Sequence, residues 1–567
     1  MKISIRGKRY VYLEPATDIV DTQYDLPSDL YSMLLKRMPF DHIQHCLDPK
    51  LKNLLPDPYI LPDMEKACLR MIKAIQNKEQ IGILGDYDVD GACSAALLVR
   101  FLKHHGIASE VYIPDRLKEG YGPNEKAFEF FKKKKCSLIF TVDCGTASST
   151  ILNQHNDIDI IVLDHHLPTE KTPSIFALVN PHLEKNCRED LKNLSAGGVT
   201  FLFLVGVNRL CNSKFDLLNL LDLVALSTVC DVMPLQGLNR AFVKQGIRVL
   251  QETKNLGIQA LCKIACLKNI QSAYDLGFVI GPRINAGGRL GQSYLGVQIL
   301  TTEDPIKAAA LADILNQLNQ ERQKLEEEIL ANAIKRVRDE KLDQFSCIVL
   351  HDPNWHAGLL GIIAARIREM YEKPTFIAGA EENGVMMGSS RSTDNVHIGN
   401  LLQKALIANL LISGGGHAKA GGFKCSITAL PDFYKFLNQE LAQNIFEPEP
   451  NGIYIKRSLS GIDRNLLDMI TCLEPFGVGH EEPIIAITDI QIKAPSLVKD
   501  QHIKCYLIDS LGHTLPAISF RALRLGLKES LFNPSSIYTC IGYLKNSPYG
   551  LQFQIFDLIP QEHKNNQ

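Results

Sequence analysis

Three aspartates, Asp86, Asp88 and Asp90, stand at alternate positions in the stretch GDYDVDG, between one apolar run and another. Carboxylates this close together repel one another, and each raises the pKa of its neighbours unless a cation neutralises them. A triplet of this kind could also be a solvated turn or a helix cap. If it binds metal, other ligands must arrive from elsewhere in the chain.

Further acids and histidines follow two other apolar runs in the same way. Asp143 comes directly after SLIFTV, and Asp164, His165 and His166 come directly after IDIIVL. Each piece alone is weak evidence, because a strand-to-turn junction or a surface histidine would look the same. Their repeated placement after apolar runs favours one shared site.

The elements that must position these residues can be inferred from the spacing between them. From about residue 80 to residue 164, short apolar runs alternate with segments of helical periodicity. This alternation predicts a mainly parallel sheet with helices on both faces. Because sites in such sheets lie beyond the carboxyl ends of the strands, we expect the acids and histidines to converge at one edge.

The ligand types indicate the chemistry. Oxygen ligands with one or two imidazoles and no thiolates favour Mn²⁺ or Mg²⁺ over structural zinc. Two such ions can stabilise both the attacking and the leaving oxygen of a phosphoryl displacement. The residues therefore predict phosphoester hydrolysis with two metal ions.

Composition limits the class of protein. The chain has 567 residues, of which 45% are hydrophobic and 22% are charged, as in folded proteins of several domains. A formal net charge of −2 is not that of a nucleic-acid binder, so a polyanion would be held by a local basic groove or by cations. We find no secretory signal and no apolar stretch long enough to cross a membrane. Fifteen scattered cysteines without a CxxC pair indicate buried thiols and a cytoplasmic location.

Changes in residue composition and in hydrophobic periodicity divide the chain into five segments. We expect an N-terminal extension (1–75), an α/β segment (76–300), a long charged connecting helix (301–342), a second α/β segment (343–450) and a β-rich segment (451–567). The helix should begin near Pro305 and end near Lys341, and the last segment suits a small β-barrel. The expected fold class is α/β with a C-terminal barrel.

The motifs resemble those of a known family. GDYDVDG, VDCG (142–145), DHH (164–166) and STVCDVMPL (227–235) are similar to the motifs of the DHH phosphoesterase superfamily. GPRINAGGR (281–289), GSSRS (388–392) and GGGHAKAGG (414–422) resemble those of its single-stranded-DNA exonucleases, which carry a DHH-associated substrate-binding domain and an OB-like domain. The resemblance covers nearly the whole chain.

This resemblance implies a set of metal ligands. It assigns one ion to Asp86, Asp88 and Asp143, and the other to Asp90, Asp143, His165 and Asp231. Asp143 would bridge the ions, while the division among the three clustered aspartates stays open. Asp164 and His166 would orient the ligands or face the phosphate.

Two arginine-bearing motifs are candidates for binding the substrate. Arg283, Asn285 and Arg289 lie in a glycine-rich frame, and guanidinium groups suit phosphate better than lysine does. Surface ion pairs are the competing interpretation for each arginine. Arg391, with Ser389 and Ser390, is by resemblance the candidate for recognising a terminal 5′-phosphate.

A glycine-rich turn supplies two more candidates, His417 and Lys419. The resemblance implies a substrate-binding loop, and backbone amides presented by glycines can also hold an anion. A plain structural turn is the alternative.

The resemblance implies a 5′-to-3′ exonuclease that is specific for single-stranded DNA, releases mononucleotides and acts in DNA repair and recombination. We expect single-stranded DNA, a helicase and a single-strand-binding protein as partners, and a monomer that does not bind membranes. The alternatives are a DHH phosphoesterase acting on short oligonucleotides or cyclic dinucleotides, and a catalytically inert replication scaffold. The second is disfavoured because every matched ligand position keeps an acid or a histidine.

Overall fold

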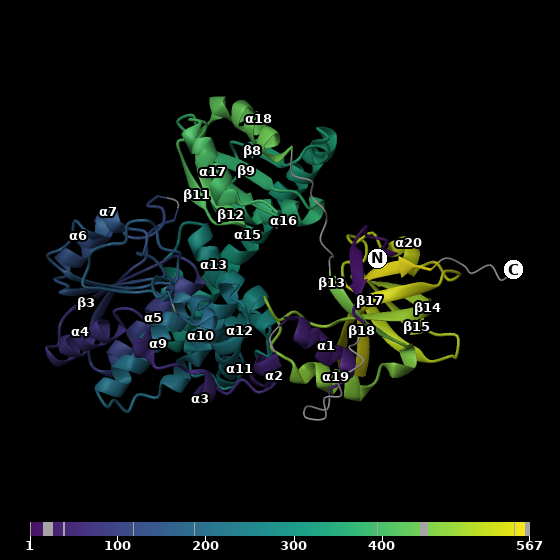
Figure 1. Ribbon diagram of the computed structural model, residues 1–567, viewed down its shortest axis with the longest axis horizontal. Coiled ribbons are helices and arrows are strands. Elements are labelled where there is room, and N and C mark those ends of the chain that lie inside the picture. The colour runs from purple at the N-terminus through teal and green to yellow at the C-terminus, as the bar shows by residue number, and fades with distance from the viewer. Residues whose placement is uncertain are drawn as a thin grey trace. The chain divides into compact units, whose positions relative to one another are not determined.

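The computed structural model describes residues 2–14, 26–37, 40–116, 118–185, 187–393, 395–442, 452–548 and 550–561 (Figure 1). It divides into two compact units. Unit 1 contains residues 1–55, 234–244 and 449–567, and unit 2 contains residues 56–233 and 245–448. No helix within the described ranges combines the length and the apolar character needed to cross a bilayer.

All strands of the first sheet of unit 2 are parallel, which confirms the predicted, mainly parallel sheet. Its strand order is β4 (Ser109–Tyr112), β3 (Ile81–Gly85), β5 (Leu138–Val142), β6 (Asp159–Leu163) and β7 (Ala177–Val179). Every residue of β3 and β5 is buried, because helices cover both faces of a parallel sheet.

Helices flank this sheet on both sides (Figure 1). On one face, Leu84 and Ile139 join a cluster with Phe128 of α6 (Glu125–Lys133) and Leu152 of α7 (Ser149–Leu152). On the other, the ring of Phe140 lies 5.5 Å from that of Phe203 in α9. The remaining helices of this part are α4 (Met64–Gln76), α5 (Val89–His104), α8 (Glu189–Lys192), α9 (Ala196–Leu210), α10 (Leu221–Cys230), α12 (Leu256–Ile264), α13 (Gly281–Arg289) and α14 (Leu295–Thr301).

A long helix and a second sheet complete unit 2. Helix α15 runs from Pro305 to Asp339, and its N-cap residue Asp304 accepts hydrogen bonds from the amides of Ile306 and Lys307. The second sheet has the order β11 (Ser413–Gly416), β12 (Ala420–Ser426), β10 (Val385–Arg391), β9 (Thr375–Glu382) and β8 (Ile348–Asp352). Its helices are α16 (Leu360–Tyr371), α17 (Ile398–Ile407) and α18 (Leu430–Leu441).

Unit 1 is built around a closed five-stranded barrel, so the predicted C-terminal barrel is confirmed. The strands are β14 (Ile484–Val498), β15 (His502–Ile508), β16 (Thr514–Ser519), β18 (Gly550–Pro560) and β17 (Tyr538–Ser547), and β17 pairs back with β14. The helices of this unit are α1 (Ser28–Arg37), α2 (Phe40–Leu47), α3 (Leu51–Leu54), α19 (Arg464–Cys472) and α20 (Lys528–Leu531). Helix α11 (Gly237–Gln251) begins in unit 1 and ends in unit 2.

The N-terminus extends the sheet of the barrel, which the sequence analysis does not anticipate. Strands β1 (Lys2–Ile3) and β2 (Arg9–Tyr12) join it through β13 (Gly452–Arg457). Buried Asp557 accepts hydrogen bonds from the hydroxyls of Ser4, at 2.7 Å, and Tyr10, at 2.9 Å. Residues at the two ends of the chain thus share one polar contact.

Arg240 ties the internal segment 234–244 to the rest of unit 1. Its side chain is 1% exposed and donates to the carbonyl oxygens of Cys46 (2.7 Å), Leu473 (2.6 Å) and Pro475 (2.8 Å). Hydrogen bonds from a charged guanidinium are stronger than those between neutral groups. Their loss would also leave buried carbonyl oxygens without donors.

We expect Arg240→Leu to lower the free energy of unfolding by about 2–4 kcal/mol, which urea denaturation followed by circular dichroism would measure. Arg524→Leu, at an exposed position in the same unit, is the matched control and should change it by less than about 0.5 kcal/mol. Equal losses in the two variants would contradict this account.

Candidate metal centre and nucleic-acid interface

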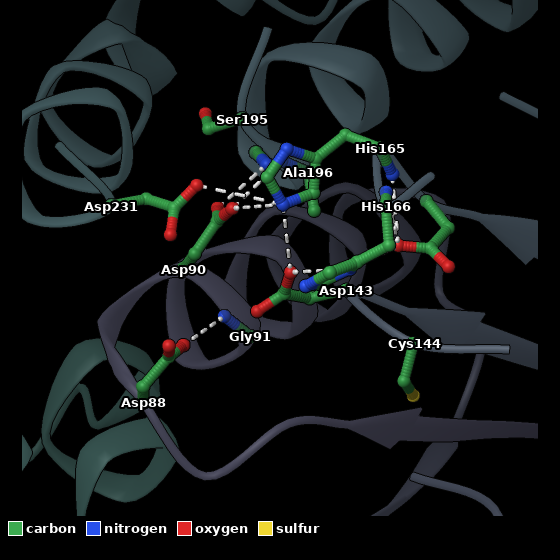
Figure 2. Close-up of polar contacts among 12 residues, drawn as sticks. Asp88, Asp90, Gly91, Asp143, Cys144, His165, His166, Ser195, Ala196 and Asp231 are labelled. Carbon is green, nitrogen blue, oxygen red and sulfur yellow. Dashed lines mark hydrogen bonds and ion pairs between the residues drawn. The ribbon is translucent and has the colours of Figure 1, made fainter. Parts of the chain in front are cut away.

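The predicted acids and histidines come together beyond the carboxyl ends of neighbouring strands (Figure 2). Asp86 follows β3, Asp143 follows β5, and Asp164, His165 and His166 follow β6. Asp143 has a φ of 60°, a left-handed conformation that aspartate tolerates better than most residues. Its amide donates to the carbonyl oxygen of Leu163 at 3.1 Å, which holds the two strand ends together.

The start of α5 positions the other two clustered aspartates. Asp88 is the N-cap residue and accepts a hydrogen bond from the amide of Gly91 at 3.1 Å. A Cβ atom on Gly91 would lie 2.5 Å from the carbonyl oxygen of Asp86, so only glycine allows this close turn. The Oδ1 atom of Asn285 accepts from the amide of Val89 at 3.1 Å.

Asp90 points into the protein from the first turn of α5. Its carboxylate accepts from the amides of Ala196 (2.7 Å) and Gly197 (2.9 Å) at the start of α9, and from the hydroxyl of Ser227. Asp231 stands at the C-cap of α10. The ends of β3, β5 and β6, the start of α5 and the end of α10 therefore bring candidate ligand atoms to one place.

Three overlapping groups of side chains could each hold a cation, with their ligand atoms within 4.8 Å of one another: Asp86, Asp88 and Asp143; Asp90, His165 and Asp231; and Asp143, His165 and His166. The Nε2 atom of His165 lies 3.3 Å from Asp143 Oδ1, 3.5 Å from Asp231 Oδ2 and 3.8 Å from Asp90 Oδ2 (Figure 2). The first two groups contain the ligands implied by the resemblance, except that Asp143 belongs to the first group and not also to the second.

Electrostatics make this cluster unfavourable without a cation. Burial, together with repulsion from neighbouring carboxylates, raises the pKa of Asp86, Asp143 and Asp231 well above the usual range for aspartate. Burial lowers the pKa of His165, and the charge on His166 adds to this effect. Among the described residues, the buried Oδ1 of Asp86, Oδ2 of Asp231 and Nε2 of His165 have no hydrogen-bond partner. Buried carboxylate oxygens and an imidazole nitrogen without hydrogen-bond partners suit divalent cations such as Mn²⁺ or Mg²⁺.

Asp164 has a different environment from Asp143. It accepts hydrogen bonds from the amides of Thr146 (2.9 Å), His165 (2.8 Å) and His166 (3.2 Å), and from His166 Nδ1 (2.8 Å). Although burial opposes it, the bond and charge of His166 hold the pKa of Asp164 well below its usual range. The side chain of Asp164 therefore orients the DHH turn.

His166 and Tyr121 lie at the mouth of the cluster. His166 Nδ1 is 3.9 Å from Asp143 Oδ1, but it is already bonded to Asp164, so we exclude that nitrogen as a metal ligand. The hydroxyl of Tyr121 donates to the carbonyl oxygen of Asp143 at 2.8 Å and lies 3.2 Å from His166 Nδ1. Tyr121 is a neighbour of the site that the sequence analysis does not identify.

A cavity of about 460 Å³ adjoins this region and is lined from both α/β parts of unit 2. Tyr87, Arg116 and Tyr121 line it from the first part, and Ser389 and Arg391 line it from β10. Successive side chains of a strand point to opposite faces, so Ser390 faces away from the cavity. Its buried hydroxyl donates to the carbonyl oxygen of Gly421 at 3.1 Å.

Several arginines gather around this cavity. Burial lowers the pKa of Arg289 to about 10, and the charges of Arg116, Arg322 and Arg391 contribute to this shift. Arg289 Nη1 donates to the carbonyl oxygen of Gly358 at 3.0 Å, and the guanidinium of Arg116 lies 4.9 Å from the ring centre of Tyr87. Such a concentration of positive charge favours an anionic ligand.

Arg116 is a candidate that sequence reasoning missed. It follows β4, so the rule that located the aspartates, residues just beyond the carboxyl end of a strand, would also have found it. An intervening loop separates it from the strand end.

The other predicted binding residues have varied surroundings. Arg283 donates to Asn316 Oδ1 (3.1 Å) and to the carbonyl oxygen of Val279 (2.7 Å). His417 and Lys419 lie in the turn between β11 and β12, where their carbonyl oxygens accept from Gly399 and Ser392. Burial lowers the pKa of His417, and the charge on His166 contributes. Their roles in binding stay predictions.

The parallel sheet, with its carboxylates and histidines at one edge, defines a phosphoesterase of the DHH type. Family models match in the same order along the chain: the N-terminal domain of the DHH family at residues 80–228, the DHHA1 domain at 344–443 and the RecJ OB domain at 455–550. The chain is 34% identical over 468 residues to the single-stranded-DNA-specific exonuclease RecJ of Haemophilus influenzae, covering 78% of this chain and 80% of that protein. It is 32% identical to RecJ of Escherichia coli over 453 residues, which cover 76% and 77% of the two chains. The chain belongs to the RecJ family.

Solved structures agree with this assignment. The crystal structure of RecJ from Thermus thermophilus with Mn²⁺ matches with a TM-score of 0.75 at 27% identity, covering 92% of this chain and 74% of that one. The same protein with Mg²⁺ matches with a TM-score of 0.69 at 26% identity, covering 92% and 73%. These are the two ions that the ligand types predict for this chain.

Proposed function

We propose that this protein is a 5′-to-3′ exonuclease specific for single-stranded DNA, which hydrolyses phosphodiester bonds with two metal ions and releases mononucleotides. The observation that carries the proposal is the buried cluster of unpaired carboxylate and imidazole atoms next to an arginine-lined cavity. One feature suits catalytic cations and the other suits a phosphate. Family membership supplies the substrate, since the relatives are named for single-stranded DNA.

The residues divide into three roles in this proposal. Asp86, Asp88 and Asp143 would hold one ion, and Asp90, His165 and Asp231, shared with Asp143, would hold the other. Divalent cations there would stabilise the charge that develops on the phosphate oxygens. Asp164 holds His166 in place from behind, so that the imidazole edge faces the substrate.

Binding of the 5′ end is assigned to the cavity. Arg391 donates to the hydroxyl of Ser389 at 3.3 Å, and Arg116 brings a second guanidinium from the first α/β part. Planar guanidinium groups bind phosphate oxygens in pairs, which fixes orientation as well as affinity. This would explain degradation from the 5′ end, because a terminal 5′-phosphate bound in the cavity determines which phosphodiester bond lies at the metal cluster.

The proposal includes the setting in which the enzyme acts. We propose a role in DNA repair and recombination, with a helicase and a single-strand-binding protein as partners, and a monomeric form. All fifteen cysteines are free, as in proteins of a reducing compartment, which supports a cytoplasmic location.

A time course with single-stranded DNA labelled at either end tests the proposal. With Mn²⁺ or Mg²⁺, the 5′ label should appear at once as a mononucleotide, while the 3′ label should pass through a ladder of shortening strands. Blunt duplex without a helicase should be degraded far more slowly. Cleavage limited to dinucleotides would instead support the small-substrate phosphoesterase, and binding without hydrolysis would support the inert scaffold.

A further inference from the structure

A second and larger cavity lies in unit 2, away from the metal cluster. Its volume is about 740 Å³, within the range of small-molecule sites. It is lined by the end of α5, the segment before α10, the end of α11 with the turn that follows, and Glu303. Along α5, Asp90 and Arg100 are ten residues apart, which corresponds to about 15 Å. The cavity and the metal ligands thus occupy opposite ends of this helix.

Most of the positively charged side chains that line the cavity make no ion pair with a described residue. Arg100, Lys214, Arg248 and Lys254 make no salt bridge to any described residue, whereas Lys103 pairs with Glu303. The acids at the wall are partly committed to other groups. Asp216 accepts from Leu218 and Asn219, and Asp222 accepts from Leu223 and Thr253. Glu252 is exposed at the rim.

Arg100 supplies a second and independent observation. Its Nη1 atom is buried and has no hydrogen-bond partner in the described part of the chain. Burial raises the pKa of Asp222, which is 2% exposed, and the charge of the Arg100 guanidinium opposes this rise. A buried N–H donor without an acceptor is costly, and an anion in the cavity would satisfy it.

Two rings form an aromatic part of the wall. The rings of His104 and Phe215 lie 4.7 Å apart, and Phe215 is held from behind by Phe101 in an edge-on contact at 5.6 Å. A fixed aromatic ring beside a group of cations suits a ligand with a planar ring and a phosphate.

We propose that this cavity binds a nucleoside monophosphate, with its phosphate near Arg100, Arg248 and Lys254 and its base against His104 and Phe215. The site is separate from the metal cluster, and the proposal does not depend on the exonuclease activity. The volume, the unpaired cations and the aromatic wall all match a single nucleotide.

Calorimetric titration of the full chain with dAMP, in the presence of a chelator, tests this binding directly. The double charge reversal Arg248→Glu with Lys254→Glu should raise the Kd for dAMP by about tenfold or more, because it removes two charged contacts. Both side chains are exposed, so the fold should be retained, which circular dichroism checks. The matched control is Lys133→Glu with Lys135→Glu, the same charge change at exposed positions near the end of α6.

Other ligands and variants decide between occupants. The titrations are repeated in the Arg391→Ala background, which removes the proposed 5′-phosphate contact; loss of all dAMP binding in that background, with full binding by the Arg248 and Lys254 variant, would overturn the proposal. Equal weakening in the Lys133 and Lys135 control would also overturn it. Inorganic phosphate that bound as tightly as dAMP would remove the role of the base. Binding of a short DNA strand without binding of dAMP would show that the cavity belongs to the binding surface for the DNA substrate, and would overturn the proposal.

Crosslinking provides a readout that does not depend on these variants. Light-activated 8-azido-dAMP should label the tryptic peptide that contains Phe215, and excess dAMP should prevent the labelling. Labelling confined to peptides of the metal cluster would overturn the proposal while leaving the exonuclease proposal standing.

Discussion

Asp143→Asn is expected to lower the rate of Mn²⁺-dependent hydrolysis of single-stranded DNA by about 10³-fold or more, or about 4 kcal/mol of barrier. Asp143 takes part in two of the three candidate cation groups and lies 3.3 Å from His165. The amide keeps the shape of the side chain but removes the charge that a cation requires. Single-turnover assays on 5′-labelled DNA, with a titration of Mn²⁺, measure both effects.

Asp164→Asn is the matched control for this experiment. Both aspartates are buried beyond strand ends, but Asp164 accepts four hydrogen bonds from protein donors. Its loss should cost about 10–100-fold, the usual effect of a group that orients a ligand from outside. The melting temperature of metal-free Asp143→Asn should not fall, because repulsion between buried carboxylates is reduced. Retention of Mn²⁺ binding in Asp143→Asn, with its loss in Asp164→Asn, would reverse our assignment.

Arg391→Ala is expected to remove the preference for a 5′-phosphorylated end. The KM for 5′-phosphorylated DNA should rise by about 10–100-fold, because a charged contact to phosphate contributes about 1.5–3 kcal/mol. The KM for DNA with a 5′-hydroxyl should change little. Steady-state assays on the two substrates measure the ratio, and Arg391→Lys should restore part of it because the charge remains.

The neighbouring serines provide controls of the same size. Ser389 lies beside Arg391 in the cavity, whereas the hydroxyl of Ser390 is bonded to Gly421 on the opposite face. Ser389→Ala should weaken binding of the 5′-phosphorylated end, and Ser390→Ala should leave it unchanged. An effect of Ser390→Ala as large as that of Arg391→Ala would show that binding does not follow the alternation of the strand.

The ends of the parallel strands could be predicted because their signal is local. An apolar run followed by an acid is visible in the sequence, and the sheet topology then brings Asp86, Asp143 and Asp164 to one edge. The orientation of Ser389 and Ser390 could not be predicted in the same way. It depends on which face of β10 is covered, and that face is determined by contacts far away in the chain.

Long-range contacts also explain what the sequence analysis left out. Arg240 is buried only because carbonyl oxygens from two distant segments meet around it. Strands β1 and β2 are too short to be recognised. β1 pairs with β2, and β2 pairs with β13, about 440 residues away. None of these features has a periodic pattern.

The hydrogen bond from the amide of Val89 to Asn285 connects the candidate DNA-binding motif with the metal cluster. Asn285 belongs to the motif expected to grip DNA, yet its side chain holds the amide at the start of the helix that carries Asp88 and Asp90. The side chain of Asn285 therefore links α13 to the first turn of α5. A substitution at Asn285 would disturb the position of Asp88 and Asp90 as well as any contact that the motif makes with DNA.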